Sequence, residues 1–415
     1  MKRKIAFLLT VALSVMSVFP AYAEDEGKKT ISMWTIATEG DANHDAFIKA
    51  IEEYETNHPD IDIEMEAFEN ESYKTKIKAS VAANELPDIY FTWGGGFSSA
   101  FVEAGKALEL DSCYEAYKDD LPESTLKYAS YDGKLYGVPY LVSISGIFYN
   151  KAMFKEYNLE EPKTWDELIQ VCQTFLDNGI TPFGVSVKEA WVMAMFNDAL
   201  TLKCVGDEKI NAAFTGSGQS YLDDDFKDAA DKLEQLIQMG AFSETAAGIS
   251  NDEAVATFTN GTVPMFVTGA WLESSVMSAE NPDDFGFMLF PACGDNAQLT
   301  DSMGGSADML MVNQGSEYPD DAANAAFEIA KLVSKYGYMS GAGIAAWKVD
   351  YEMENQSAIS KTMSDCINDS TSLTVWSGSL MEAEDYTEYQ ALLQQFFVGD
   401  LTAEDFVEAM DAQLN

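Results

Sequence analysis

Hydrophobic and polar residues alternate along the first third of the chain with two different periods. Runs with a period of two, or a short continuous apolar run, predict three strands, at residues 31–36, 61–65 and 88–93. Apolar residues spaced three or four apart predict the helices that follow them, at residues 47–54, 73–81 and 97–104. The second helix would bury Tyr73 and Ile77 and point Lys74, Lys76 and Lys78 away. Strands that alternate with helices indicate an α/β fold with a mainly parallel sheet flanked by helices.

The same alternation returns later in the chain. Thr164 and Glu167 form a capping box that opens a helix, with Trp165 interpreted as structural. Further helices are predicted at 222–237, 320–336 and 402–410, and a further strand at 263–267. A chain of 415 residues is too long for one ordinary core, and no low-complexity linker divides it. We therefore expect two α/β lobes without a flexible tether.

Three tryptophans fall at or near the carboxyl ends of predicted strands: Trp34, Trp93 and Trp271. Ligands of open α/β sheets bind in the crevice outside these ends. Aromatic faces ringed by acids, amides and backbone groups suit a neutral ligand with apolar faces and polar edges, such as a sugar. The alternative is that each tryptophan is a buried core residue at a tight turn.

The charge of the chain is strongly negative. It has 25 Lys and Arg against 69 Asp and Glu, a formal net charge of −44. Such a surface repels nucleic acid and anionic lipid, so neither is expected as a partner. The excess of acids favours a well-solvated surface.

The amino terminus is typical of an export signal. Lys2-Arg3-Lys4 precedes an apolar stretch over 5–19, and Ala21-Tyr22-Ala23 supplies a cleavage site. About fifteen apolar residues are short for a membrane span, which needs ~20. Residues 1–23 are thus predicted to be a signal peptide that is removed on export.

Catalytic, metal and cofactor patterns are weak. The two histidines, His44 and His58, precede and end a predicted helix, so a Ser-His or Cys-His site is not indicated. The stretch 41–46 resembles a calcium loop in part but has Ala46 where glycine is needed. No metal, cofactor or catalytic residue is predicted. The five cysteines have no CxxC spacing and are expected to be free thiols, with a single disulfide between two of them as the alternative.

Several motifs together carry a family resemblance. The stretch "DGKLYGVPYLVSISGIFYNKAMFKEYNLEEPKTWDEL" at 132–168 resembles the signature of bacterial extracellular solute-binding proteins of the carbohydrate-uptake, maltose-binding-like group. "ELPDIYFTW" (85–93), "FTNGTVPMFVTGAWL" (258–272) and "FFVGDLTAEDFVEAM" (396–410) are similar to the same family and follow in the same order. The anchor cysteine that many such proteins carry is missing after the signal, which leaves a periplasmic location or free secretion open.

The resemblance implies a two-lobed fold of the periplasmic-binding-protein type II, with a sugar held in the cleft. Lobe one would comprise residues 24–140 and 307–349, and lobe two residues 141–306 and 350–415. By position, Trp93 would be the platform of lobe one and Trp271 that of lobe two. The remaining candidate ligand-binding residues are Trp34, Trp191, Trp376, Glu39, Asp41, Gly94, Gly304 and Gly305. The glycines after Trp93 would let the next helix start close to the ligand.

The function that this resemblance implies is non-catalytic. An exported, monomeric receptor would bind an oligosaccharide and present it to the membrane permease subunits of an ABC importer. A secreted glycoside hydrolase is an alternative, since it needs only two carboxylates. A receptor of the same fold for a cationic solute such as a polyamine is another, because cation–π contacts also use tryptophan.

Overall fold

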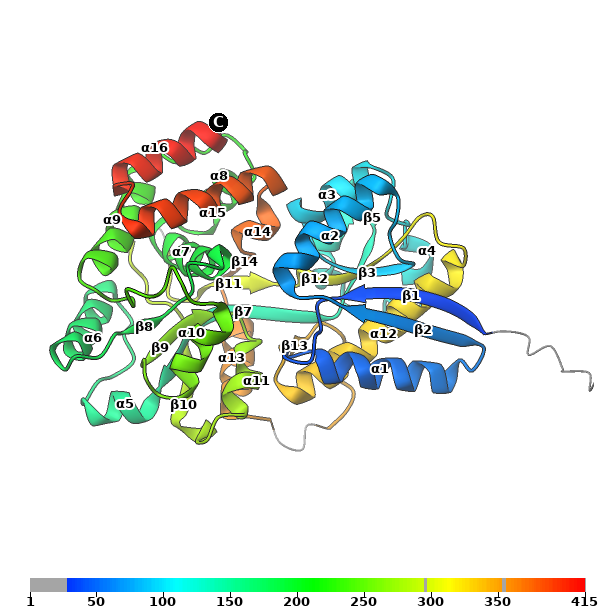
Figure 1. The fold of residues 1–415 in the computed structure, drawn as a ribbon, viewed down its shortest axis with the longest axis horizontal. Helices are drawn as coiled ribbons and strands as arrows, with labels where there is room; N and C mark the ends of the chain where they lie inside the picture. Colours follow the sequence, from blue (N-terminus) through cyan, green and yellow to red (C-terminus); the bar gives the residue numbers. More distant parts are fainter. Residues whose placement is uncertain (1–27, 295–296, 353–355, 415) are drawn as a thin grey trace, which may run out of the picture.

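The protein folds into two α/β lobes that lie side by side and share crossing strands (Figure 1). The computed structural model describes residues 28–294, 297–352 and 356–414. The expected signal peptide, residues 1–23, lies outside the described residues. Among the helices of the described ranges, none has the length and apolar character needed to cross a membrane.

The first lobe is built on a sheet with the strand order β2-β1-β3-β12-β6. Its strands are β1 (Lys29–Thr35), β2 (Ile61–Ala67), β3 (Ile89–Trp93), β6 (Gly137–Pro139) and β12 (Asp308–Val312). The first three pair in parallel, as their alternation with helices predicts, whereas β12 runs antiparallel to β3 and β6. The sheet is therefore mixed rather than mainly parallel, because the chain returns through β12 from the other lobe.

Helices cover both faces of this sheet. They are α1 (His44–Asn57), α2 (Asn70–Ala83), α3 (Gly96–Glu103), α4 (Asp111–Tyr114) and α12 (Pro319–Ser340). Two 3₁₀ turns (Glu123–Thr125, Lys127–Ala129) and the hairpin of β4 (Ser130–Tyr131) and β5 (Lys134–Leu135) complete the lobe. Helix α12 packs along α1 although more than 260 residues separate their centres in sequence.

The second lobe is built around β7 (Leu141–Asn150), the long strand that enters it from the first. The sheet order is β14-β11-β7-β9-β8, and β10 and β13 also pair with β7. The other strands are β8 (Phe183–Gly184), β9 (Met265–Thr268), β10 (Phe285–Met288), β11 (Asp301–Gly305), β13 (Ile344–Ala345) and β14 (Ser372–Thr374). Strand β7 runs antiparallel to all four of its partners, whereas β14 pairs with β11 and β8 with β9 in parallel, so this sheet too is mixed.

Helix α7 (Ala190–Val205) lies at the centre of the second lobe and is buried on every side from Val192 to Val205. It packs against α9, α15 and the strands β9 and β11. The other helices of the lobe include α6, whose capping box of Thr164 and Glu167 is confirmed. They are α5 (Lys151–Glu156), α6 (Trp165–Asp177), α8 (Asp207–Phe214), α9 (Asp224–Gln238), α10 (Asn251–Thr259), α11 (Leu272–Met277), α13 (Ala358–Asp369), α14 (Ser377–Leu380), α15 (Ala383–Val398) and α16 (Ala403–Leu414), with a 3₁₀ turn at Pro282–Asp284.

Buried apolar residues form two separate clusters, one in each lobe. One cluster draws on 31–141 and 309–347, and the other on 144–303 and 359–410. The chain thus passes between the cores near 142, near 306 and again beyond 347. The lobe limits given from the sequence stay a prediction.

Candidate ligand-binding cleft

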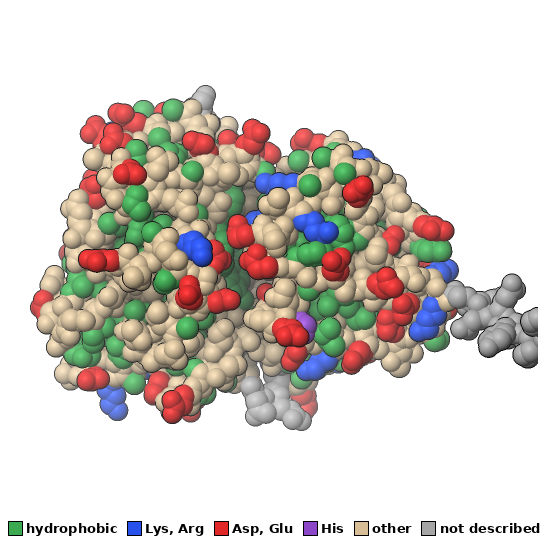
Figure 2. All heavy atoms as spheres, in the orientation of Figure 1, with side chains coloured by type: hydrophobic (Ala, Val, Ile, Leu, Met, Phe, Trp, Pro, Cys, Tyr) green, Lys and Arg blue, Asp and Glu red, His purple; other side chains and the backbone are tan. Residues whose placement is uncertain are grey.

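A cleft of about 320 Å³ lies between the two lobes and is lined by residues of both. Figure 2 shows this cleft as a groove between the lobes, with Asp and Glu side chains on both sides of it. The elements that reach it from lobe one are the loop after β1, the start of α2 and the paired ends of β3 and β12. From lobe two come the starts of α7 and α10, the end of β9 and the starts of α11 and α14.

Three tryptophans form the wall on the side of lobe two. Trp191 is in the first turn of α7, Trp271 directly precedes α11, and Trp376 directly precedes α14. The ring centroid of Trp271 lies 6.4 Å from that of Trp191 and 5.8 Å from that of Trp376, the latter pair edge to face. All three side chains line the cleft and are only partly buried. This cluster offers a continuous aromatic surface with Trp271 at its middle.

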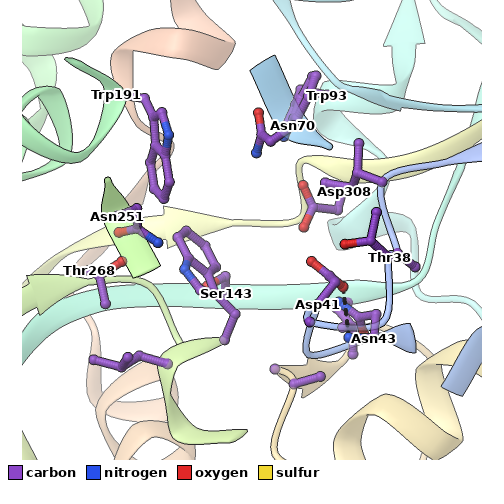
Figure 3. Close-up of a pocket in the computed structure, with 18 of the residues that line it drawn as sticks. Thr38, Asp41, Asn43, Asn70, Trp93, Ser143, Trp191, Asn251, Thr268 and Asp308 are labelled. Carbon is purple, nitrogen blue, oxygen red and sulfur yellow. Dashed lines mark hydrogen bonds between the residues drawn. The ribbon is translucent and has the colours of Figure 1, made fainter. Parts of the chain in front are cut away.

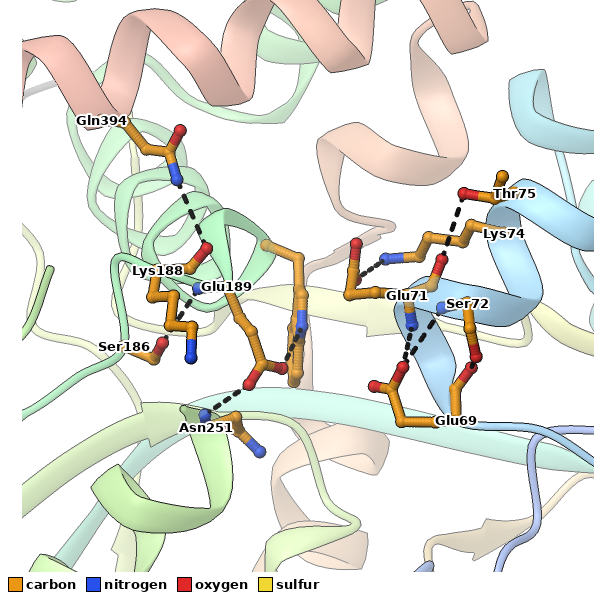
Figure 4. Close-up of polar contacts among 11 residues, drawn as sticks. Glu69, Glu71, Ser72, Lys74, Thr75, Ser186, Lys188, Glu189, Asn251 and Gln394 are labelled. Carbon is orange, nitrogen blue, oxygen red and sulfur yellow. Dashed lines mark hydrogen bonds and ion pairs between the residues drawn. The ribbon is translucent and has the colours of Figure 1, made fainter. Parts of the chain in front are cut away.

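The backbone and neighbouring polar groups hold this wall in place. The Trp271 indole lies on Gly269, where an added Cβ would come within 2.1 Å of the ring. The Trp191 Nε1–H donates to Glu189 Oε2 at 3.3 Å, and Glu189 Oε1 accepts from the Asn251 backbone N–H at 2.7 Å (Figure 4). Glu189 therefore ties Trp191 to the start of α10.

Trp376 is positioned by a buried carboxylate on α7. Asp198 accepts from the Ser377 backbone N–H at 2.8 Å and from its hydroxyl at 2.7 Å. The Tyr389 hydroxyl donates to the other carboxylate oxygen at 2.7 Å. Burial raises the pKa of Asp198 to about 6 despite these hydrogen bonds. The network fixes the backbone next to Trp376 and joins α7, α14 and α15.

Trp93 and Asp308 form the edge of the lobe-one sheet in the cleft. They lie directly opposite each other in the β3–β12 register, so their side chains share one face of the sheet. Figure 3 shows Trp93 and Trp191 on opposite sides of the cleft. The Trp93 ring packs edge to face on Phe91 and Phe97, at centroid distances of 4.8 and 5.0 Å. Trp93 is therefore both a cleft residue and part of an aromatic cluster.

Lysines of α2 lie over aromatic rings, and Lys74 and Lys76 are partly buried there, whereas Lys78 is exposed as predicted. Lys74 Nζ is 5.3 Å from the Trp93 centroid and 2.7 Å from Glu71 Oε1. Lys76 Nζ is 4.1 Å from the Trp34 centroid, and Lys78 Nζ is 5.2 Å from that of Phe97. A long lysine side chain can place its ammonium group over a neighbouring ring, which periodicity alone does not reveal.

Two carboxylates lie on the lobe-one side of the cleft. Asp41 follows β1 and accepts the Asn43 backbone N–H at 2.8 Å, as Figure 3 shows. Burial raises the pKa of Asp41 to about 6. Burial also raises the pKa of Asp308 to about 7, and the negative charge of Asp41 adds to that shift. Both carboxyl groups are thus costly to ionise, and hydrogen-bond donors on a ligand would stabilise their ionised forms.

Amide groups add further hydrogen-bonding capacity. Asn70, in the first turn of α2, has a buried side-chain oxygen without a protein partner in the described chain. Such an atom is expected to bind water or ligand. Asn251 and Thr268 face it from lobe two (Figure 3). Across the described ranges, no group of three or more His, Cys, Asp or Glu side chains is placed to hold a metal ion.

Five of the ten candidate residues from the sequence line the cleft. These are Trp93, Trp191, Trp271, Trp376 and Asp41. The other five, Trp34, Glu39, Gly94, Gly304 and Gly305, are not among the lining residues. Trp34 packs edge to face on Phe68 with a centroid distance of 5.5 Å, and Glu39 is exposed to solvent.

The glycines after Trp93 allow close contacts between backbones, and the expected approach of the next helix to the ligand stays a prediction. An added Cβ would lie 2.3 Å from the Tyr128 carbonyl oxygen at Gly94, 1.9 Å from that of Ser379 at Gly95 and 2.1 Å from that of Met381 at Gly96. Ser379 and Met381 belong to the α14 region of lobe two, so two of the glycines let the lobes touch directly.

Gly304 has a comparable role in the crossing strands. It pairs with Ile144 of β7, and an added Cβ there would lie 2.3 Å from the Ser143 carbonyl oxygen. Gly305 has a φ of +147°, a conformation that other residues adopt rarely. Both glycines lie at the junction between the lobes, and their expected role toward the ligand stays a prediction.

Sequence reasoning missed several polar residues of the cleft. They include Asn70, Glu189, Asn251, Thr268 and Asp308. Of these, only Asp308 could have been noticed in the sequence, because it is a charged residue directly before the apolar stretch 309–312. The others sit at helix starts or a strand end, and what brings them together is the approach of the two lobes.

A cleft between two lobes, with aromatic faces and a few convergent polar groups, is typical of a site that binds a small molecule. The chain belongs to the bacterial extracellular solute-binding protein family, whose model matches residues 40–335. Members of this family are binding proteins rather than enzymes, and the family implies an ABC transporter and export.

Individual relatives support this assignment. An uncharacterized ABC transporter extracellular-binding protein of Pyrococcus horikoshii is 25% identical over 79% of this chain and 76% of its own. The multiple sugar-binding protein of Streptococcus mutans is 24% identical over 81% of this chain and 80% of its own. A solved structure from work on xylan utilization by the thermophilic bacterium Caldanaerobius polysaccharolyticus is 32% identical. It covers 93% of this chain and 100% of its own, with a TM-score of 0.89.

Proposed function

We propose that this protein is the sugar-binding receptor of an ABC importer and that it holds an oligosaccharide in the cleft between its lobes. The observation that carries the proposal is the arrangement of Trp191, Trp271 and Trp376 opposite Trp93, Asp41 and Asp308. Sugar rings present C–H groups on their faces and hydroxyls at their rims. Indole faces suit the first, and carboxylates and amides suit the second.

The names of relatives narrow the ligand class. The Streptococcus mutans relative is a multiple sugar-binding protein, and the structure that is 32% identical comes from work on xylan utilization. Three adjacent tryptophans provide more aromatic surface than one sugar ring covers. Xylo-oligosaccharides of two to five units are therefore the first ligands to test.

Export and assembly complete the proposal. Residues 1–23 act as a signal peptide, and the mature chain begins at Glu24. The receptor works as a monomer and delivers its sugar to permease subunits in the membrane. The basic residues 2–4, the apolar stretch after them and the family itself support this part. Intact-mass analysis of exported protein should give the mass of the chain from residue 24.

The binding test is a titration against a ligand panel with a cleavage assay on the same samples. Calorimetry should detect a xylo-oligosaccharide or another oligosaccharide, and chromatography should recover that sugar uncut after prolonged incubation. Trp271→Ala should bind this sugar much more weakly, and Trp165→Ala, whose altered residue is not among the cleft-lining residues, should bind it like the wild type. Release of shorter products would show a hydrolase. Binding of spermidine without any sugar would show a receptor for cations.

A further inference from the structure

Two cysteines of the second lobe meet away from the cleft. Cys204 is in the last turn of α7, and Cys293 follows β10, 89 residues later. Their Sγ atoms are 2.9 Å apart. A disulfide has a sulfur–sulfur distance of about 2.05 Å, so the two atoms need to move closer by roughly 0.9 Å. Neither residue is among those that line the cleft.

The backbone around the pair holds the two segments together. The Cys293 N–H donates to the Lys203 carbonyl at 3.1 Å. Gly294 lies so close to Cys204 that an added Cβ would be 2.1 Å from its carbonyl oxygen. The buried Lys203 ammonium donates to the Leu299 carbonyl at 2.7 Å and to that of Gln298 at 3.2 Å. The contact between the sulfurs is therefore set by the fold and not by one side-chain rotamer.

We propose that Cys204 and Cys293 form an intramolecular disulfide when the protein meets a disulfide oxidant outside the cytoplasm. Disulfides persist in such compartments, and this family is extracellular. The bond would close a loop of 89 residues and fasten the segment after β10 to the end of α7.

The chemistry is two thiol–disulfide exchanges. Cys293 is only partly buried, so its thiolate attacks the oxidant, forms a mixed disulfide and expels one thiol. Cys204 is buried, and its hydrogen bond to Cys293 and its burial raise its pKa. It therefore reacts second: its thiolate attacks Cys293 Sγ, and the second thiol of the oxidant leaves. Two protein thiols are oxidised, one external disulfide is reduced, and the two protons pass to the departing thiolates.

Alkylation under denaturing conditions tests the bond in the full exported chain. Of the five cysteines, three should react without prior reduction and five after it. Cys204→Ser and Cys293→Ser should each give four reactive thiols with or without reduction. Cys366→Ser is the matched control, because it should keep the bond and give two reactive thiols before reduction and four after. A peptide map should link the segments that contain residues 204 and 293.

A second measurement tests the chemistry without relying on export. Reduced, folded protein is treated with oxidised glutathione, and its intact mass is measured by mass spectrometry. A loss of two hydrogens without a glutathione adduct is expected, together with a rise of roughly 5 °C in the thermal midpoint. Five reactive thiols in the exported chain, a stable glutathione adduct on Cys293 or a bond to Cys366 would overturn the proposal. None of these outcomes depends on which ligand the cleft binds.

Discussion

The two walls of the cleft differ in how aromatic and polar side chains are arranged. The wall of lobe two has three tryptophans at the starts of helices, with the rings of Trp191, Trp271 and Trp376 in contact and the polar Glu189, Asn251 and Thr268 beside them. The wall of lobe one carries Asp41, Asp308 and Asn70 at the ends of strands and helices, with Trp93 beside them. The free energy of contact with an aromatic wall depends on the apolar area that is buried and little on direction. A carboxylate, in contrast, stabilises a ligand only where a hydrogen-bond donor points at one of its oxygens.

This difference indicates a division of roles between the lobes. Apolar contact contributes roughly 25 cal/mol per Å² and tolerates small shifts of the ligand. A hydrogen bond contributes about 1 kcal/mol net, but an unpaired buried partner costs more than that. We therefore expect lobe two to supply most of the affinity and lobe one most of the selectivity.

The largest expected effect is that of Trp271→Ala. Its ring lies between the other two, so its loss removes the middle of the stacking surface. A cost of about 2–3 kcal/mol is expected for such a side chain. Calorimetry should show a dissociation constant roughly 30- to 150-fold higher, since 1.4 kcal/mol is tenfold. A variant that binds its sugar like the wild type would show that the aromatic wall is not the binding surface.

Trp93→Ala is expected to have a smaller effect on affinity and a larger one on stability. Its ring also packs on Phe91 and Phe97, so the substitution opens a gap in the lobe-one cluster. We expect a loss of roughly 5- to 30-fold in affinity, or about 1–2 kcal/mol. The melting temperature of the ligand-free protein should fall as well. If Trp93→Ala weakened binding more than Trp271→Ala, the proposed division between the lobes would be reversed.

Asp308 should show opposite effects of pH on affinity and on stability. Its pKa is raised from 3.8 to about 7 by burial and by Asp41, so the folded protein binds this proton more tightly than the unfolded chain. Its contribution to the stability of the ligand-free protein is thus greatest below about pH 4 and is lost as pH rises through about 7. A sugar hydroxyl donates a stronger hydrogen bond to the ionised carboxylate than to the neutral acid, so affinity should instead rise from pH 6 to pH 8.

Asp308→Asn tests both trends in one variant. At pH 8 it should raise the melting temperature of the ligand-free protein and weaken sugar binding by roughly 5- to 10-fold, the difference between a charge-assisted hydrogen bond and the neutral one that Asn can still accept. Its affinity should change less between pH 6 and pH 8 than that of the wild type. An unchanged pH profile of binding in the variant would assign the titration to another group, with Asp41→Asn the next to measure.

The smallest effect on binding is expected from Trp165→Ala. Trp165 starts α6, donates to Gln235 Oε1 at 3.2 Å and lies outside the cleft lining. Its loss should lower the melting temperature and leave the affinity of the folded protein within about twofold. A larger loss of affinity would mean that tryptophan replacement weakens binding by general destabilisation, and the Trp271 result would need the same explanation.

The sequence determined elements whose patterns are local. The strand that ends at Trp93, the amphipathic helices α1 and α9 and the capping box of Thr164 follow from periodicity and from chemistry within a few residues. The family resemblance placed Trp191, Trp271 and Trp376 as candidates, and all three line the cleft. Tryptophan is conspicuous in a sequence because it is large and rare, so its placement at element ends is informative.

Tertiary structure decided the features that depend on distant segments. Helix α7 has no polar face to mark it, because neighbours from the whole second lobe surround it. Asp308 becomes a cleft residue because β12 pairs with β3 from more than 200 positions away. Gly95 and Gly96 are needed because the backbone of the α14 region packs directly against them. The sulfurs of Cys204 and Cys293 come into contact although the two residues are 89 positions apart in the sequence. A periodic pattern reports which side of an element is buried, but not which distant segment buries it.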